Sequence, residues 1–234
     1  MGLATAKTLL SRGAMVALCD LNQDSLEQVV DELDADCRKR SFARRVDLND
    51  RAALKAFLED SKAHFGKLDG IANFAGTAGR HLGTEAVWET SDDEFDFIMK
   101  VNVTGMFYVL SEALKPGFMS LGGSIVQIGS IFSMQGFNKG AVYATSKHAA
   151  LGMVRSAAKE AGGRVRVNCV LPGAVDTPMH RANLARVPDF PAISTPIPRA
   201  GEAQEVANVT VFLLSDESSF VTGAAWSVDG GANA

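Results

Sequence analysis

The chain has few of the residues that mark secreted, metal-binding or nucleic-acid-binding proteins. Its three cysteines, Cys19, Cys37 and Cys169, form no CxxC pair, so we expect unpaired thiols without a catalytic role. The four histidines show no HExxH or His-x-His spacing, which argues against a metal site. The formal net charge is -4 and Lys and Arg are scattered, so there is no basic patch for a nucleic acid or an anionic membrane.

Long apolar runs are also missing. Runs such as VFLL at 211–214 are far shorter than a bilayer span, and the first residues lack the charged-then-apolar order of a secretory signal. We therefore expect a cytoplasmic protein with no membrane partner. With 234 residues, 47% of them apolar, the chain can fold as one α/β domain over residues 1–234 with a continuous core.

Short β-branched runs alternate along the chain with longer segments of helical periodicity. The opening residues, MGLATAKTLLSRGAMVALCD, predict a helix followed by a buried strand. This alternation is typical of a parallel sheet covered on both faces by crossover helices. We expect strands at 14–20, 39–47, 68–76, 123–130, 164–173 and 224–231. We expect further helices at 23–35, 50–65, 91–118, 141–161 and 202–214.

One long irregular stretch, 176–201, contains five of the seven prolines. A stretch of this length inside a compact domain is usually a lid or a binding loop, and here it is expected to cover a substrate. Together with the loop at 77–91, this stretch is expected to determine which substrate binds. Met179, Phe190 and Trp88 favour an apolar substrate, although such residues more often pack a lid against its own domain.

In an open parallel sheet, ligands bind beyond the carboxyl ends of the strands. Asp20 ends a predicted strand eighteen residues after Gly2, near the spacing at which an acid contacts the ribose 2′-OH of NAD. Its carboxylate would also repel the 2′-phosphate of NADP, so NAD is favoured. The alternative is that Asp20 only caps the next helix, in competition with Asn22 and Asp24.

The next two predicted strands end in weaker signals. Asp47, followed by Leu48, stands where a carboxylate can accept from an adenine amino group, with Asn49 or Asp50 as the expected helix cap. Asn73 and Gly76, in NFAG, would allow a flat ligand to approach the backbone closely. A plain turn explains this second motif equally well.

The segment SIFSMQGFNKGAVYATSK, residues 130–147, carries the strongest chemical signal. Tyr143 and Lys147 stand four apart on a predicted helix, so both side chains project from one face. The lysine cation would favour the ionised phenol, as general acid or base catalysis by Tyr143 requires. Ser130 can hydrogen-bond the same substrate oxygen. The Tyr–Lys pair alone is weak evidence, because this spacing is common on solvated helix faces.

The ordered set NFAG, KVNVTG, Ser130, Tyr143, Lys147 and NCVLPGAVDTP resembles the short-chain dehydrogenase/reductase (SDR) family, over nearly the whole chain from Gly2 to SVDGG at 227–231. The resemblance implies a Rossmann-like, doubly wound three-layer fold and a catalytic tetrad of Asn102, Ser130, Tyr143 and Lys147. Asn102 is expected to hold a water in the proton relay. The residues implied in cofactor binding are Gly2, Asp20, Asp47, Leu48, Asn73, Ala75, Gly76, Tyr143, Lys147, Pro172, Gly173 and Thr177.

In that family a strand and a TGxxxGxG loop precede the helix that begins here at Gly2, so the resemblance implies an N-terminally truncated member. Losing about five buried side chains, at roughly 1.5–3 kcal/mol each, would equal the whole stability of a typical domain. Either the chain is a fragment begun at an internal methionine, or the neighbouring strands pair across the gap. We hypothesise the latter, a single six-stranded sheet.

Three functions are open at this point. The first is an oxidoreductase that interconverts a secondary alcohol and a ketone with NAD, or less readily with NADP. The second is an acid–base catalyst of isomerisation, elimination or cyclisation without a nicotinamide, because the diphosphate-binding glycines are missing. The third is a non-catalytic scaffold. The resemblance also implies a homodimer or homotetramer formed through 91–118, 141–161 and the C-terminal strand, whereas the substrate and the reaction direction cannot be predicted.

Overall fold

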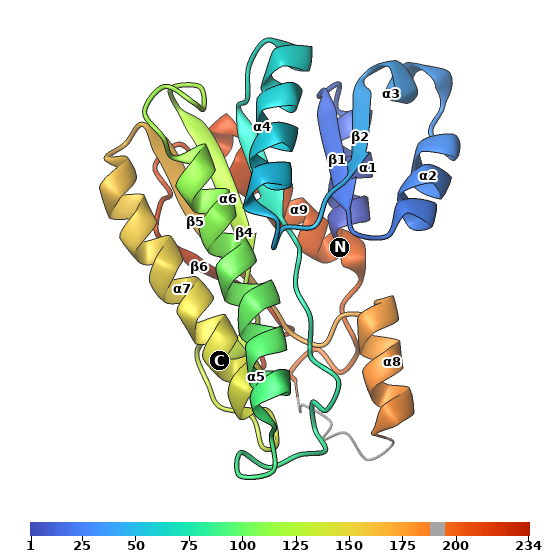
Figure 1. Ribbon diagram of the computed structural model, residues 1–234, viewed down its shortest axis with the longest axis vertical. Coiled ribbons are helices and arrows are strands. Elements are labelled where there is room, and N and C mark those ends of the chain that lie inside the picture. Colours follow the sequence, from blue (N-terminus) through green and yellow to red (C-terminus); the bar gives the residue numbers. More distant parts are fainter. Residues whose placement is uncertain (188–194) are drawn as a thin grey trace.

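The computed structural model describes residues 1–187 and 195–234 (Figure 1). Strands and helices alternate along the chain, and all strand pairs are parallel. The strands are β1 (Val16–Asp20), β2 (Ser41–Arg45), β3 (Gly70–Asn73), β4 (Gly123–Ile128), β5 (Val165–Pro172) and β6 (Ala225–Val228). The helices are α1 (Gly2–Ser11), α2 (Gln23–Asp31), α3 (Ala35–Lys39), α4 (Arg51–Phe65), α5 (Asp92–Met99), α6 (Gly105–Ala113), α7 (Ala141–Ala161), α8 (Pro178–Arg186) and α9 (Ala203–Leu214). Shorter helical turns are the π-helix η1 (Lys100–Thr104) and the 3-10 helices η2 (Ile131–Ser133) and η3 (Asp216–Ser218).

The expected strands are all present, and the Rossmann-like fold class is confirmed. The helices differ from expectation in three places. The helix expected at 23–35 ends at Asp31, and a separate short helix, α3, follows it. The segment 91–118 is not one helix, because η1 interrupts it between α5 and α6, and α6 ends at Ala113. The stretch 176–201 is not wholly irregular, because α8 lies within it. Phe190, one of the residues expected to favour an apolar substrate, lies outside the described residues.

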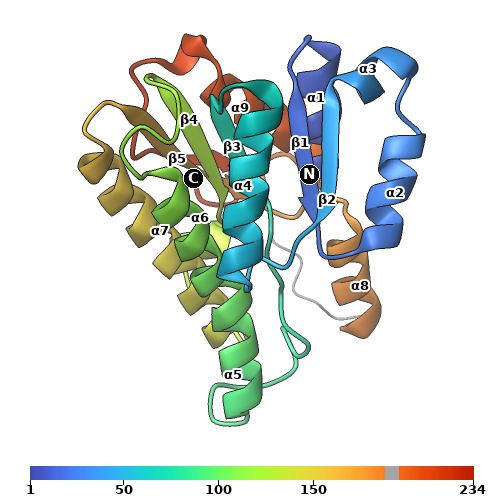
Figure 2. The ribbon, with the colours of Figure 1, turned by 45° about the horizontal axis from the view of Figure 1, so that its top comes forward.

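The hypothesis of a single six-stranded sheet is wrong. Strands β1 and β2 form a sheet of their own, and β3, β4, β5 and β6 form a second one in that order. Figure 2 shows the β1–β2 pair beside β3, with α4 in front. Within the described residues, β1 and β3 therefore each have one strand neighbour instead of two.

Packing against helices explains why the two sheets stay apart. On one side, Leu54, Phe57 and Leu58 of α4 form a cluster with Phe42 of β2 and Ile71 of β3, so this helix spans both sheets. On the other side, α1 packs on α9, which packs on β3 to β6, and Gln204 Nε2 donates to Thr8 Oγ1 at 2.9 Å. Pairing β1 with β3 would shift β1 sideways and open these contacts.

The core is centred on β4 and β5. Every residue of these two strands is buried, as expected of central parallel strands with helices on both faces. The largest apolar cluster lies between these two strands on one side and helices α6 and α7 on the other. A second cluster lies between the sheet and α9. Among the described helices, none combines the length and the apolar character needed to cross a bilayer.

Candidate functional site

The expected site residues follow the carboxyl ends of the strands, which lie along one edge because the strands are parallel. Tyr143 and Lys147 lie on α7, one turn apart. Lys147 is buried, and its Nζ lies 5.7 Å from the centre of the Tyr143 ring and donates to the carbonyl of Ile128 at 3.3 Å. The cation is therefore held between the phenol and the end of β4.

Asn102 lies on η1, where the π-helical turn interrupts the helix. Such turns occur frequently at functional sites, and the helical periodicity of the sequence does not reveal this one. The buried Asn102 side chain accepts from Thr77 N at 2.7 Å and donates to Thr77 O at 2.8 Å. Its amide also donates to Ser146 Oγ at 3.0 Å. Asn102 thus joins α7 to the segment that follows β3.

Gly76 lies next to the side chains of both Asn102 and Lys147. A Cβ atom built on this glycine would lie 3.2 Å from Asn102 Oδ1 and 3.5 Å from Lys147 Nζ. The two side chains expected to act together therefore both border Gly76, and a Cβ at this position would press against Asn102.

Ser130 begins the turn η2 directly after β4 and is buried. Its Oγ accepts from Phe132 N at 3.2 Å, and the Phe132 ring lies edge-on to Tyr143 with centroids 6.2 Å apart. The turn that carries Ser130 therefore packs directly against α7. Behind it, burial raises the pKa of the Cys169 thiol to about 12, so this cysteine stays protonated at neutral pH.

Two acidic residues on the β1–β2 side lie at or after the strand ends: Asp20 ends β1 as expected, whereas Asp47 lies two residues beyond β2, which ends at Arg45. Asp20 is exposed at the end of β1, and its Oδ1 accepts from Asn22 N at 2.9 Å. The N-cap of α2 is Asn22, not Asp20, which leaves the outer carboxylate oxygen of Asp20 open to solvent. Asp47 Oδ1 accepts from Asn49 N at 2.9 Å, while Asp50 caps α4 as expected.

The other expected cofactor residues lie at the same edge. Asn73 Oδ1 accepts from Ala75 N at 3.1 Å, which closes the turn after β3. Leu48 contacts Gly105 at the start of α6, 3.3 Å from the position of a Cβ there. Pro172 ends β5, and Gly173 passes so close to Asp229 that an added Cβ would lie 2.8 Å from its Cα. Thr177 caps α8 by accepting from His180 N at 3.3 Å.

The two ends of the site differ in how well they fit a nicotinamide dinucleotide. At the Tyr143 end, the Tyr143 hydroxyl and the Lys147 ammonium, whose Nζ lies 5.7 Å from the centre of the phenol ring, are polar groups suited to a ribose and a nicotinamide. At the start of α1, Gly2 faces the Phe74 side chain, so that a Cβ atom built on this glycine would lie 3.3 Å from Phe74 Cβ. The chain therefore has an aromatic neighbour where the expected diphosphate would meet the helix.

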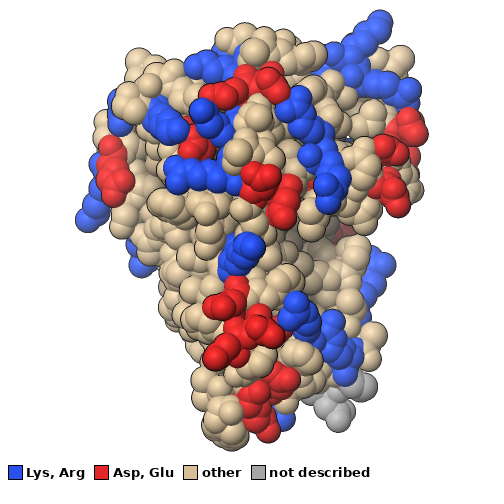
Figure 3. Space-filling view, viewed as in Figure 1, with Lys and Arg blue, Asp and Glu red and all other residues tan. Residues whose placement is uncertain are grey.

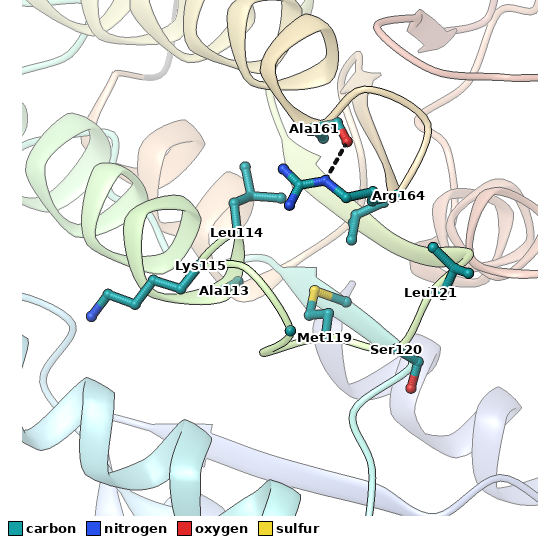
Figure 4. A pocket seen from close by; sticks show the side chains of 10 residues that line it. Ala113, Leu114, Lys115, Met119, Ser120, Leu121, Ala161 and Arg164 are labelled. Carbon is teal, nitrogen blue, oxygen red and sulfur yellow. Dashed lines mark hydrogen bonds between the residues drawn. The ribbon is translucent and has the colours of Figure 1, made fainter.

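Two cavities show where space is left in the folded chain. One of about 160 Å³ is lined mostly by apolar residues, together with Lys115, Ser120 and Arg164, at the ends of α6 and α7 and the start of β5 (Figure 4). It lies at the opposite end of the strands from Tyr143 and so is not the expected site. The other, of about 20 Å³, is lined by Tyr143, Leu82, Glu94 and Ile98 among others. This small cavity lies between the start of α7, α5 and the loop 77–91.

Several residues that shape the site were not expected from sequence. Glu94, Arg80 and Arg186 are joined by hydrogen bonds that run from α5 through the segment after β3 to α8. Ser91 and Glu94 have the spacing of a capping box, but the Glu94 carboxylate turns to Arg80 instead. A Thr-Pro pair at 177 and 178 was the available signal for the start of α8.

The surface charges, the possible metal ligands and the exposed apolar side chains bear on the expectations from the sequence. Acidic and basic side chains are interspersed on the face shown in Figure 3. Within residues 1–187 and 195–234, no three His, Cys, Asp or Glu side chains gather in a group that could hold a metal ion. Trp88 is 84% exposed and Met179 is 46% exposed, so neither is packed into the domain.

Comparison with known proteins gives consistent matches over the full chain. Residues 1–233 match the family model described as enoyl-(acyl carrier protein) reductase. The short-chain dehydrogenase/reductase aba4 of Botryotinia fuckeliana is 39% identical, over 99% of this chain and 92% of that protein. The trans-4-hydroxycyclohexanecarboxylate dehydrogenase of Sinomonas cyclohexanicum is 34% identical, over 100% of this chain and 89% of that protein.

Solved structures give the same result. The crystal structure of levodione reductase superposes with a TM-score of 0.88 at 30% identity, covering 100% of this chain and 93% of that one. The structure of ElxO with NADP bound superposes with a TM-score of 0.86 at 25% identity, covering 99% and 94% of the two chains. The chain is thus similar to these proteins in sequence and in fold over almost its whole length.

Proposed function

This chain belongs to the short-chain dehydrogenase/reductase family of oxidoreductases, and we propose that it interconverts a secondary alcohol and a ketone with a nicotinamide cofactor. The observation that carries the proposal is the position of Lys147, whose Nζ lies 5.7 Å from the centre of the Tyr143 ring and which borders Gly76 together with Asn102. One relative is named for a ring-borne secondary alcohol, trans-4-hydroxycyclohexanecarboxylate. A compound of that class, small and partly apolar, is our proposed substrate.

Each residue of the tetrad has a separate role in this proposal. Tyr143 donates its phenolic proton to the carbonyl oxygen during reduction and accepts it back during oxidation. Ser130 donates a hydrogen bond to the same oxygen and orients it. Lys147 stabilises the phenolate by its positive charge, and Asn102 holds the segment at Thr77 and orders the groups behind Lys147. A bound nicotinamide would supply or accept the hydride.

We also propose NAD as the preferred cofactor, because the exposed Asp20 carboxylate would accept from a ribose 2′-OH and repel a 2′-phosphate. Asp47, Leu48, Asn73, Ala75 and Gly76 would line the adenine and ribose side. Pro172, Gly173 and Thr177 would line the nicotinamide side, together with Tyr143 and Lys147. Gly2 would lie next to the diphosphate.

The Tyr143→Phe variant tests the proposal. It removes the proton donor but keeps the ring, so turnover of trans-4-hydroxycyclohexanecarboxylate with NAD should fall by at least about a hundredfold. NADH binding, followed by its fluorescence, should stay within about twofold. The matched control is Tyr108→Phe on α6, outside the site, which should behave like the wild type. Unchanged turnover in Tyr143→Phe, or no saturable NADH binding by the wild-type chain, would contradict the proposal.

We further propose that the cytoplasmic chain forms a homodimer or homotetramer through α5, α6, α7 and β6. Phe95 on α5 and Phe107 on α6 are 45% and 47% exposed, which is apolar area that a second copy can cover. A monomer mass in light scattering of the purified chain would contradict this association.

A further inference from the structure

Helix α8 is held to the rest of the described chain by very little. None of its residues is buried, so apolar burial cannot fix its position. Thr177 caps its first turn, and Arg181 pairs with Asp176 at 2.7 Å, but both contacts stay inside the same segment. Among the described residues, the hydrogen bonds that join α8 to a distant part of the chain come from Arg186.

Arg186 reaches the segment that follows β3. Its Nη1 donates to the Arg80 carbonyl and lies 3.4 Å from the Gly79 carbonyl. Figures 1 and 2 both show this segment running between α5 and α8. The two carbonyls are separated from Arg186 by more than a hundred residues of sequence, so this contact forms only in the folded chain.

The carbonyl groups of Gly79 and Arg80, which accept from Arg186, are held in place by residues of α5. Glu94 is 2% exposed, and its carboxylate accepts from Arg80 N at 2.5 Å and from Arg80 Nη1 at 3.0 Å. The Arg80 guanidinium also lies over the Phe97 ring, 4.4 Å from its centre. Gly79 has φ +82° and packs so closely on Glu94 and Ile98 that a Cβ atom would overlap both.

The same segment is tied to the catalytic side. Gly79 N donates to Thr77 Oγ1 at 3.1 Å, and the Thr77 backbone is paired with Asn102. Glu94 and Tyr143 line one cavity. Residues 77–80 therefore connect Asn102 at one end with Arg186 at the other, and Glu94 supports them from beneath.

We propose that Arg186 is a latch that holds α8 over the substrate side of the site, and that Glu94 is the positioning residue that presents the latch's two acceptors. The inference rests on the proposed function and deepens it: the latch sets how tightly the substrate is held, whereas Tyr143 carries out proton transfer. Breaking the latch should therefore raise KM and leave kcat largely unchanged.

Hydrogen exchange of the wild-type chain and of Arg186→Gln tests the latch without any substrate. Backbone amides of 178–187 should exchange about five- to tenfold faster in the variant, because α8 opens locally more often. Arg181→Gln is the matched control, since it removes the same charge from the same helix but no contact with Gly79 or Arg80. Arg186→Lys, which keeps one donor, should give an intermediate rate. Equal rates in Arg186→Gln and Arg181→Gln would overturn the latch.

Glu94→Gln tests the positioning role. Loss of the carboxylate charge should increase exchange both at 77–80 and at 178–187, whereas Asp93→Asn, exposed on the same helix, should change neither. Faster exchange at 77–80 with unchanged exchange at 178–187 would show that Glu94 does not act through the latch. That result would overturn its proposed role.

Kinetics with trans-4-hydroxycyclohexanecarboxylate and NAD connect the latch to catalysis. Arg186→Gln should raise KM about fivefold, the size of one exposed charge-assisted hydrogen bond, with kcat and NADH affinity within about twofold. A fall in kcat at constant KM would contradict the proposed role. If the wild-type chain does not turn this compound over, the proposed substrate class fails, while the exchange experiments still decide the latch.

Discussion

The sheet β3 to β6 and the sheet β1–β2 differ sharply in burial although both are parallel and both carry expected site residues. In β4 and β5 every residue is buried, whereas no residue of β1 or β2 is. Ser130, Tyr143 and Lys147, on or next to the larger sheet, are fixed by buried neighbours, while Asp20 lies at an exposed strand end. The chemical half of the site is therefore built on a rigid sheet, and the expected adenosine half is built on a loosely covered one.

The largest expected effect is on stability, and it compares one leucine from each sheet. Leu171 of β5 is fully buried, whereas Leu18 of β1 is half-buried. Leu171→Ala should lower the free energy of unfolding by about 3 kcal/mol and Leu18→Ala by about 1 kcal/mol, because less packing is lost at the half-buried position. Urea denaturation of the two variants measures the difference. Equal losses would show that the β1–β2 sheet is packed as tightly as the larger one.

The next largest effect is on the choice between NAD and NADP, through Asp20 at the exposed end of β1. Asp20→Asn removes the negative charge that would repel a 2′-phosphate, so the ratio of NADPH to NADH dissociation constants should fall about tenfold. Turnover with saturating cofactor should change little, because Asp20 is far in sequence and structure from the proton donor. Asp24→Asn, in the first turn of α2, is the control. An unchanged ratio would mean that Asp20 serves only the turn at Asn22.

The smallest effect is a pH dependence at the start of α9, the helix on which both parts of the molecule pack. Hydrogen bonds from Arg199, followed by one from the Glu202 backbone, lower the pKa of Glu205 from 4.5 to about 2. A lowered carboxyl pKa stabilises the fold while the group is charged. This contribution is therefore complete above pH 4.5 and is lost as the pH falls toward 2.

Both partners of this pair are exposed, at 52% and 40% of their side chains, so the effect on stability is slight. Melting temperatures of Glu205→Gln and wild type should converge as the pH falls from about 6 to about 2.5. Glu160→Gln, exposed on α7, is the control and should follow the wild type. A constant difference between Glu205→Gln and wild type over this range would contradict the assignment.

The elements of this fold could be read from local patterns because each depends on nearby residues. Short β-branched runs located all six strands, and Asp50 was among the caps expected for α4. The Tyr143 and Lys147 pair could be found for the same reason, since four residues on one helix fix their relative position. By contrast, the π-helical turn at Asn102 depends on Thr77 and Ser146, 25 and 44 residues away, and helical periodicity does not reveal it.

Local patterns along the chain are enough to predict the order of strands and helices, their parallel direction and the residue types at the carboxyl edge, because these follow from periodicity and spacing within about twenty residues. The division of the strands into two sheets arises only in the folded chain, because the position of β1 is fixed by α1 on α9 and by α4. Tertiary packing also brings Arg186 to Gly79 and Arg80, and it buries Glu94 beneath them. These contacts join distant segments, so they form only when the whole chain packs.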